Sequence, residues 1–172
     1  MFCPSYIYMN TIYEIITEKN KDLNIIRQET GMDEIEREEF LQTFNQENDL
    51  IAFAVIGGIF SEGIDLVGEK LIGAIIVGVG MPMISFERNI IKDYFESNGK
   101  NGFEYAYTYP GMNKVLQGSG RVIRSPEDKG AVLLIDDRYR TNKYRSLFPR
   151  EWGNYKRVNK NTIKQKLRLF WD

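Results

Sequence analysis

The strongest pattern in the chain is found at Gln117-Gly118-Ser119-Gly120-Arg121-Val122-Ile123-Arg124. At about 100° per residue, a helix would place Gln117, Arg121 and Arg124 on one side. The opposite side would be apolar and would carry Val115, Leu116, Val122 and Ile123. The sequence has no acidic residue between positions 109 and 125, so the two guanidinium groups would be available to an external anion. Planar, permanently charged groups of this kind suit the oxygens of a phosphate chain.

Two glycines interrupt this predicted helix. Gly118 and Gly120 each lower helix stability by about 1 kcal/mol relative to alanine in a helix interior. Such a penalty is expected where another group approaches the backbone closely. The helix is expected to end at Ser125-Pro126, because proline disfavours helical backbone in the residue before it.

The composition is that of a globular domain. The chain has 172 residues, 42% apolar and 27% charged, with a formal net charge of −1. This balance argues against a general coat of positive charge but permits local basic patches. There is one cysteine, Cys3, and no histidine. That excludes an internal disulfide, a four-cysteine iron–sulfur cluster, a histidine-ligated zinc and a histidine-activated nucleophile, so we expect no metal site.

The sequence predicts no membrane partner. Its longest apolar run, 71–83, contains three glycines and is too short to span a bilayer. No secretory signal is visible at the N-terminus, so a cytoplasmic location is expected.

Apolar runs alternate with segments of helical period. Residues 50–56 and 71–79 are typical of strands buried on both sides of a parallel sheet. Shorter strands are expected at 23–26 and 131–135, and the chain begins abruptly with what reads as the end of a truncated strand. This order predicts an α/β fold with a mainly parallel sheet and helices on both faces.

Three helices have clear start signals. Ser5 and Ser85 are expected N-caps, and Asp33 with Glu36 resembles a capping box before a helix that runs to about Phe44. The helix after Ser85 is expected to reach about Ser97. Its inward apolar stripe is predicted to be Phe86, Ile90, Ile91 and Tyr94.

Aromatic residues alternate with other residues from Phe103 to Tyr109. This alternation fits a strand or a stacking platform for nucleic-acid bases. Stacking platforms normally include Lys and Arg, which this segment lacks, so we favour core packing. Near the C-terminus, 155–169 is strongly basic with apolar residues at helical spacing, which predicts an amphipathic helix.

Three motifs together resemble a known family. The pattern Gln117-x-x-Gly120-Arg121-x-x-Arg124 resembles motif VI of the superfamily 2 helicases. Upstream, Ser61-Glu62-Gly63-Ile64-Asp65 resembles motif V of their DinG/XPD branch, and Leu134-Ile135-Asp136-Asp137-Arg138 follows as it does in that branch. The resemblance implies the second RecA-like motor domain of a DNA helicase, over residues 1–152. The basic residues 153–172 are then an extension expected to pack on the same domain.

The resemblance also implies a nucleotide site. Arg121 and Arg124 would reach the γ-phosphate of ATP, with Gln117 beside them. Four further residues would lie at the nucleotide, namely Glu62, Gly63, Asp65 and Gly120. Asp65 could accept a hydrogen bond from the ribose or hold a motif VI arginine in position. For Asp136, Asp137 and Arg138 we favour a local brace of the loop.

A nucleic-acid track is implied by the segment Phe2-x-Pro4-Ser5-Tyr6, which is similar to motif IV. Ser5, Tyr6 and Arg88 are the candidate contacts with single-stranded DNA. Each has a simpler alternative: Ser5 as a helix cap, Tyr6 as a packed aromatic ring, and Arg88 in a surface ion pair.

The chain lacks the parts that hold the nucleotide. It has no Gly-x-x-x-x-Gly-Lys-Ser/Thr loop and no Asp-Glu pair at the end of an apolar strand. We therefore expect it to be inactive alone, with ATP and Mg²⁺ held mainly by the N-terminal helicase domain of the same protein. Any iron–sulfur cluster would lie in that half, and DNA repair is a fitting role. The alternatives are a non-catalytic nucleic-acid-binding or adaptor domain and a self-contained nucleotide-binding regulatory domain.

Overall fold

The computed structural model describes residues 1–46, 49–58, 60, 71–123 and 128–172. The chain divides into two compact units, Met1–Asp136 and Asp137–Asp172, and each is described here by itself. The expected boundary at residue 152, and the docking of residues 153–172 on the preceding domain, stay predictions.

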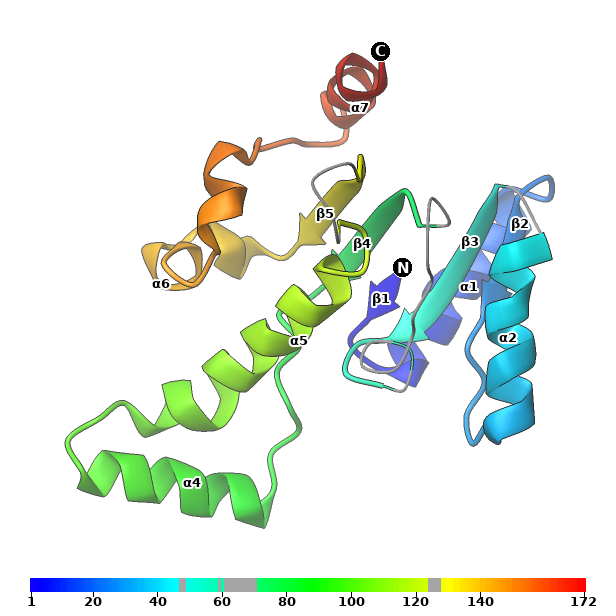
Figure 1. Ribbon diagram of the computed structural model, residues 1–172. Helices are drawn as coiled ribbons and strands as arrows, with labels where there is room; N and C mark the ends of the chain where they lie inside the picture. The colour runs from blue at the N-terminus through cyan, green and yellow to red at the C-terminus, as the bar shows by residue number, and fades with distance from the viewer. Residues whose placement is uncertain (47–48, 59, 61–70, 124–127) are drawn as a thin grey trace. The chain divides into compact units, whose positions relative to one another are not determined.

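The first unit is built on a five-stranded parallel sheet (Figure 1). The strand order is β2-β3-β1-β4-β5, which places the N-terminal strand in the middle. Phe2 in that strand lies opposite Ala54 on one side and Ile76 on the other. The strands are β1 (Phe2–Cys3), β2 (Asn24–Arg27), β3 (Leu50–Val55), β4 (Gly73–Val77) and β5 (Ala131–Ile135). The prediction of a mainly parallel α/β sheet is confirmed.

Helices cover both faces of this sheet. Cys3 packs in one apolar cluster with Met9 of α1 (Tyr6–Lys19) and Phe53 of β3. The neighbouring Phe2 instead lies against Gly118 of α5 (Tyr109–Ser119). Because successive strand residues point to opposite faces, α1 and α5 lie on opposite sides of the sheet.

The expected helix starts are confirmed. The Ser5 hydroxyl accepts a hydrogen bond from the backbone N–H of Tyr8 at 3.2 Å. Before α2 (Glu34–Gln46), the Asp33 N–H donates to the Glu36 carboxylate and the Glu36 N–H donates to Asp33, at 2.8 and 2.9 Å. The Ser85 hydroxyl caps α4 (Phe86–Ser97) in the same way as Ser5 caps α1.

The predicted inward stripe of α4 is wrong. Its four residues are exposed, at 76% for Phe86, 53% for Ile90, 36% for Ile91 and 63% for Tyr94. The helix turns a different side toward the following helical segment, where Phe95 stacks on Tyr105 at 3.8 Å between ring centroids. Periodicity identified the helix, but tertiary contacts decided which side is covered.

The aromatic segment is helical, so the strand interpretation of residues 103–109 is wrong. A π-helix, η1 (Glu104–Thr108), leads directly into α5. Residues that alternate at i and i+2 also repeat at i and i+4, which is a helical spacing. Two such pairs have ring centroids 5.0 and 5.1 Å apart: Phe103 with Tyr107, and Tyr105 with Tyr109. Core packing is confirmed for Tyr107, which is 4% exposed.

The helix of the opening pattern is shorter than predicted. It ends at Ser119, and Gly120 forms its C-cap by donating its N–H to the Leu116 carbonyl at 2.9 Å. Arg121 therefore lies in a turn after the helix, not on the helix. Val122, at 5% exposure, is buried near the start of β5. A continued helix would carry Val122 away from the sheet. The backbone turns instead, and the apolar side chain is buried.

The second unit consists of short helical segments with an aromatic core. It contains η2 (Asp137–Arg140), α6 (Asn142–Arg145), η3 (Arg150–Asn154) and α7 (Ile163–Trp171). The ring of Phe148 lies 5.2–6.0 Å from those of Tyr139, Trp152 and Tyr155. The predicted amphipathic helix near the C-terminus is present as α7. No helix in the described part of the chain is long and apolar enough to cross a membrane.

Candidate functional site

The carboxyl edge of the sheet is where ligands of parallel α/β domains collect. Three neighbouring strands end there, and each is followed by a turn. Pro4–Tyr6 follows β1, Gly57–Gly58 follows β3, and Gly78–Gly80 follows β4. The turns after β1 and β4 lie close together, because a Cβ placed on Gly78 would be 3.7 Å from that of Pro4.

Gln28 holds two of these strand ends together. Its side chain is 3% exposed. The Nε2 atom donates to the hydroxyl of Tyr6 at 2.7 Å, and the Oε1 atom accepts from the N–H of Val55 at 3.0 Å. Sequence reasoning missed this residue. A polar residue directly after β2, at Asn24–Arg27, is the signal that could have drawn attention to it.

The candidate nucleic-acid residues all have local structural partners. Ser5 caps α1, and Tyr6 packs against the core cluster, as the simpler alternatives for these residues require. The Tyr6 hydroxyl also accepts the hydrogen bond from Gln28. Arg88 forms no surface ion pair with a described residue; its Nη1 atom donates to the carbonyl of Ala106 in the π-helix at 3.3 Å. Their contacts with DNA stay predictions.

The motif VI residues lie at and after the end of α5. Gln117 is exposed, and Gly120 is exposed at the helix end. A Cβ on Gly118 would lie 3.4 Å from the Phe2 ring, so its close approach is to the sheet of this domain. Arg121 is half-buried and has an interaction within the chain. The other candidates, Glu62, Gly63, Asp65 and Arg124, lie outside the described residues.

Perturbed pKa values in the described residues arise from local burial and hydrogen bonds. Burial raises the pKa of the Cys3 thiol to about 11, so this thiol is not a nucleophile at neutral pH. The hydrogen bond from Tyr109 to the Glu104 carboxylate raises the pKa of Tyr109, and the bond from Arg145 to Tyr155 lowers that of Tyr155. No group of three acidic or thiol side chains that could hold a metal ion is found in the part of the chain described.

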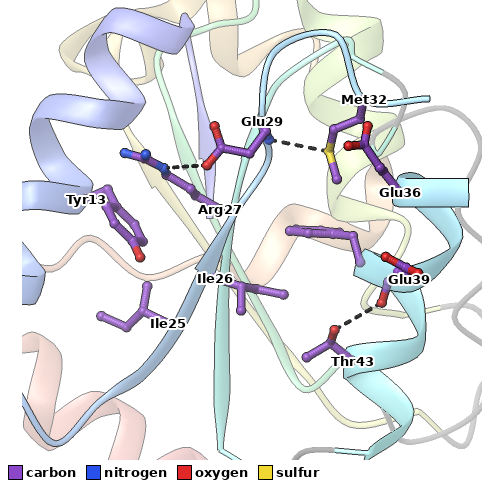
Figure 2. Close-up of a pocket in the computed structure, with 10 residues that line it drawn as sticks. Tyr13, Ile25, Ile26, Arg27, Glu29, Met32, Glu36, Glu39 and Thr43 are labelled. Atoms are coloured by element: carbon purple, nitrogen blue, oxygen red, sulfur yellow. Dashed lines mark hydrogen bonds and ion pairs between the residues drawn. The ribbon is translucent and has the colours of Figure 1, made fainter. Parts of the chain in front are cut away.

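An open pocket lies beside β2, the edge strand on the other side of the sheet from β5 (Figure 2). It is lined by residues of α1, the edge strand β2, and α2. Arg27 pairs with Glu29 at 3.0 Å on its rim and lies over the Tyr13 ring at 4.7 Å. None of the sequence-predicted site residues lines this pocket, so we do not place the site there.

A solved structure has the same fold as this domain. A solved structure named XPD_APO matches 85% of this chain and 29% of its own length, with a TM-score of 0.67 and 21% sequence identity. The domain is therefore a RecA-like α/β domain of the kind found in XPD helicases. The family follows from the sequence: the helicase C-terminal domain model matches residues 1–155, and the chain belongs to that family.

Curated relatives are named as DNA helicases. The ATP-dependent DNA helicase DinG of Photobacterium profundum is 35% identical over 103 residues, which is 59% of this chain and 15% of that protein. The ATP-dependent DNA helicase CHL1 of Vanderwaltozyma polyspora is 29% identical over 160 residues, which is 83% of this chain and 19% of that protein. The chain thus spans about a fifth or less of the length of these relatives.

Proposed function

We propose that this chain acts as the second motor domain of an ATP-dependent DNA helicase of the DinG/XPD type. The observation that carries the proposal is the family match over residues 1–155. The segments that resemble motifs IV, V and VI occur within that range, in that order. The parallel sheet supports it, because Gly118, within the segment that resembles motif VI, packs against Phe2 of the central strand. In this role the domain supplies one side of a composite ATP site and part of a single-stranded DNA track.

Arginine chemistry is the contribution of this domain to hydrolysis. A first motor domain of the same protein holds ATP and Mg²⁺, and ATP supplies the phosphoryl group that is transferred to water. Arg121 and Arg124 then stabilise negative charge on the γ-phosphate across the domain interface, with Gln117 beside them. Arginine fingers of this type are worth about 10³–10⁵ in rate. Glu62, Gly63 and Asp65 of motif V, with Gly120, complete the nucleotide side.

The DNA side of the domain is the carboxyl edge of the sheet. Ser5 and Tyr6 lie there at the start of α1, directly after the central strand. Arg88 is a weaker candidate, because its guanidinium group braces the π-helix. Closure of the two motor domains on ATP and their opening after hydrolysis would move the protein along one strand of DNA.

The test uses the full-length enzyme that contains this chain and a Walker A domain. Arg124→Ala is expected to lower the DNA-stimulated ATPase rate by at least about 10³-fold, the lower end for an arginine finger. Single-stranded DNA binding should stay near the parental value. Arg168→Ala, which removes an exposed arginine in α7, is the control and should leave the rate unchanged.

Two outcomes would count against the proposal. An Arg124→Ala enzyme that hydrolyses ATP at the parental rate would remove the finger assignment. A parental protein that binds DNA but has no ATPase activity would favour an adaptor domain that kept the helicase fold.

A further inference from the structure

Lys114 of α5 reaches the turn that follows β3. A Cβ placed on Gly57 would lie 2.5 Å from the Lys114 Cδ atom and 2.6 Å from Cε and Nζ. The lysine side chain therefore lies directly over this glycine, whose φ of 72° also disfavours any other residue. The ammonium group is thereby held at the carboxyl edge of the sheet.

Close backbone packing fixes the position of the Lys114 backbone and Cβ atom. A Cβ on Gly80 would lie 2.7 Å from the Gly111 carbonyl oxygen and 3.4 Å from the Cβ of Lys114. A Cβ on Gly111 would in turn lie 2.6 Å from the Val79 carbonyl oxygen. The first turn of α5 thus lies against the turn after β4, and this contact aims Lys114 across the edge toward the end of β3.

The charge of Lys114 has no acidic counterpart in the described structure. Ion pairs in the described residues include Arg27 with Glu29, Lys92 with Glu96, and Arg140 with Asp137, and Lys114 takes part in none of these. The stretch from residue 109 to 125 contains no carboxylate either. The Cδ and Cε atoms make an apolar contact with Gly57, and this part of the contact does not depend on the positive charge. Among the described residues, the ammonium group is the part of this side chain that has no partner.

This lysine is not part of the motif VI cluster. Arg121 lies seven positions after Lys114, and α5 covers most of that interval, which corresponds to about 10 Å along a helix axis. The helix runs antiparallel to the strands, so Lys114 lies nearer the carboxyl edge than Arg121 does (Figure 1).

We propose that Lys114 binds a phosphate oxygen at the carboxyl edge of the sheet, and that this phosphate belongs to the backbone of single-stranded DNA. The inference rests on the proposed helicase function. It adds a residue that lies outside the three helicase motifs. An ammonium group on a flexible stem suits a phosphodiester, which needs a point charge more than a fixed bidentate partner.

The test measures single-stranded DNA binding and ATP use by Lys114→Gln, Lys114→Arg and Lys21→Gln in the full-length enzyme. Lys21 is an exposed lysine before β2, at the opposite edge of the sheet, and controls for loss of one positive charge. Lys114→Gln is expected to weaken binding of an oligothymidine about tenfold, as for one charged hydrogen bond. The slope of log affinity against log salt should fall by about 0.7, the value for one phosphate contact with a single strand.

The readouts separate the possible sources of phosphate. Restored DNA affinity in Lys114→Arg, with Lys21→Gln at the parental value, would establish the DNA contact. A raised KM for ATP with unchanged DNA binding would keep the phosphate site but assign it to the nucleotide. Parental DNA affinity, salt slope and KM in Lys114→Gln would overturn the inference and leave the motor function standing. A parental enzyme with neither DNA binding nor ATPase would overturn both.

Discussion

Gln28 is the buried polar residue that joins distant parts of the first unit. Replacement by alanine leaves the Val55 N–H without its acceptor and the Tyr6 hydroxyl without its donor. Unsatisfied groups of this kind cost about 1–3 kcal/mol each when buried. We expect Gln28→Ala to lower the free energy of unfolding by about 1–3 kcal/mol for each group left unpaired, as measured by urea denaturation. Gln42→Ala, at an exposed position of α2, should stay within about 0.5 kcal/mol of the parent.

The two halves of this network should be coupled. Tyr6→Phe removes the hydroxyl that Gln28 bonds, so the double variant should lose less stability than the sum of the two single variants. Additive losses would show that the bond from Gln28 to Tyr6 contributes nothing to the folded state.

At the scale of single residues, local partners were predictable and distant ones were not. The caps at Ser5 and Ser85 were identified because each bonds a backbone N–H three residues away. The partners of Gln28 lie 22 and 27 residues away. No short pattern encodes such a separation, and the sequence gives only a polar residue after a strand.

The element that positions the candidate site is α5, and its contact with the turn after β4 is testable. In Gly111→Ala the new methyl group would lie 2.6 Å from a backbone carbonyl, which has no room to move. We expect a loss of about 1–3 kcal/mol or more in the free energy of unfolding. Gly118→Ala is the matched control in the same helix. Its methyl group would meet Phe2 at 3.4 Å, a cost that the gain of about 1 kcal/mol in helix propensity offsets.

Equal stability of the two alanine variants would contradict the close contact between α5 and the turn after β4. The comparison is measured by thermal and urea unfolding of both variants. It also bears on Lys114, because the position of that side chain depends on the same contact.

Helix positions were predicted better than helix surroundings. The bounds of α4 follow from its cap and its period, which are local. The side it buries depends on η1, whose π-helical form was not foreseen, because aromatic alternation at i+2 fits a strand equally well. The end of α5 was also missed. The burial of Val122 near β5, which turns the chain at Gly120, is a contact between distant segments.

At the scale of the whole molecule, the parallel sheet was predictable but its order was not. Continuous apolar runs indicated β3 and β4, and their alternation with helices indicated parallel pairing. The opening residues indicated the end of a buried central strand, but no residue pattern identified β3 and β4 as the neighbours of this two-residue strand, β1. That position matters for the site, because it places the turn at Ser5 between the turns after β3 and β4.

The central place of β1 makes Cys3 a probe of global unfolding. Its thiol is 0% exposed, and only a thiolate reacts with iodoacetamide. We expect no alkylation of the folded chain at pH 8, and we expect the rate to rise with urea in parallel with unfolding. Burial raises the thiol pKa from 9.0 in the unfolded chain to about 11. The thiol therefore favours the folded state below pH 9, and this contribution is lost as the pH rises toward 11.

The alkaline effect is isolated by Cys3→Ala. The stability difference between the parent and this variant should shrink by roughly 2–3 kcal/mol between pH 8 and pH 11, because only the parent carries the thiol. Alkylation in native buffer that is far faster than global unfolding would show that β1 detaches by itself. In that case the turn at Ser5 would not be held in place by the sheet.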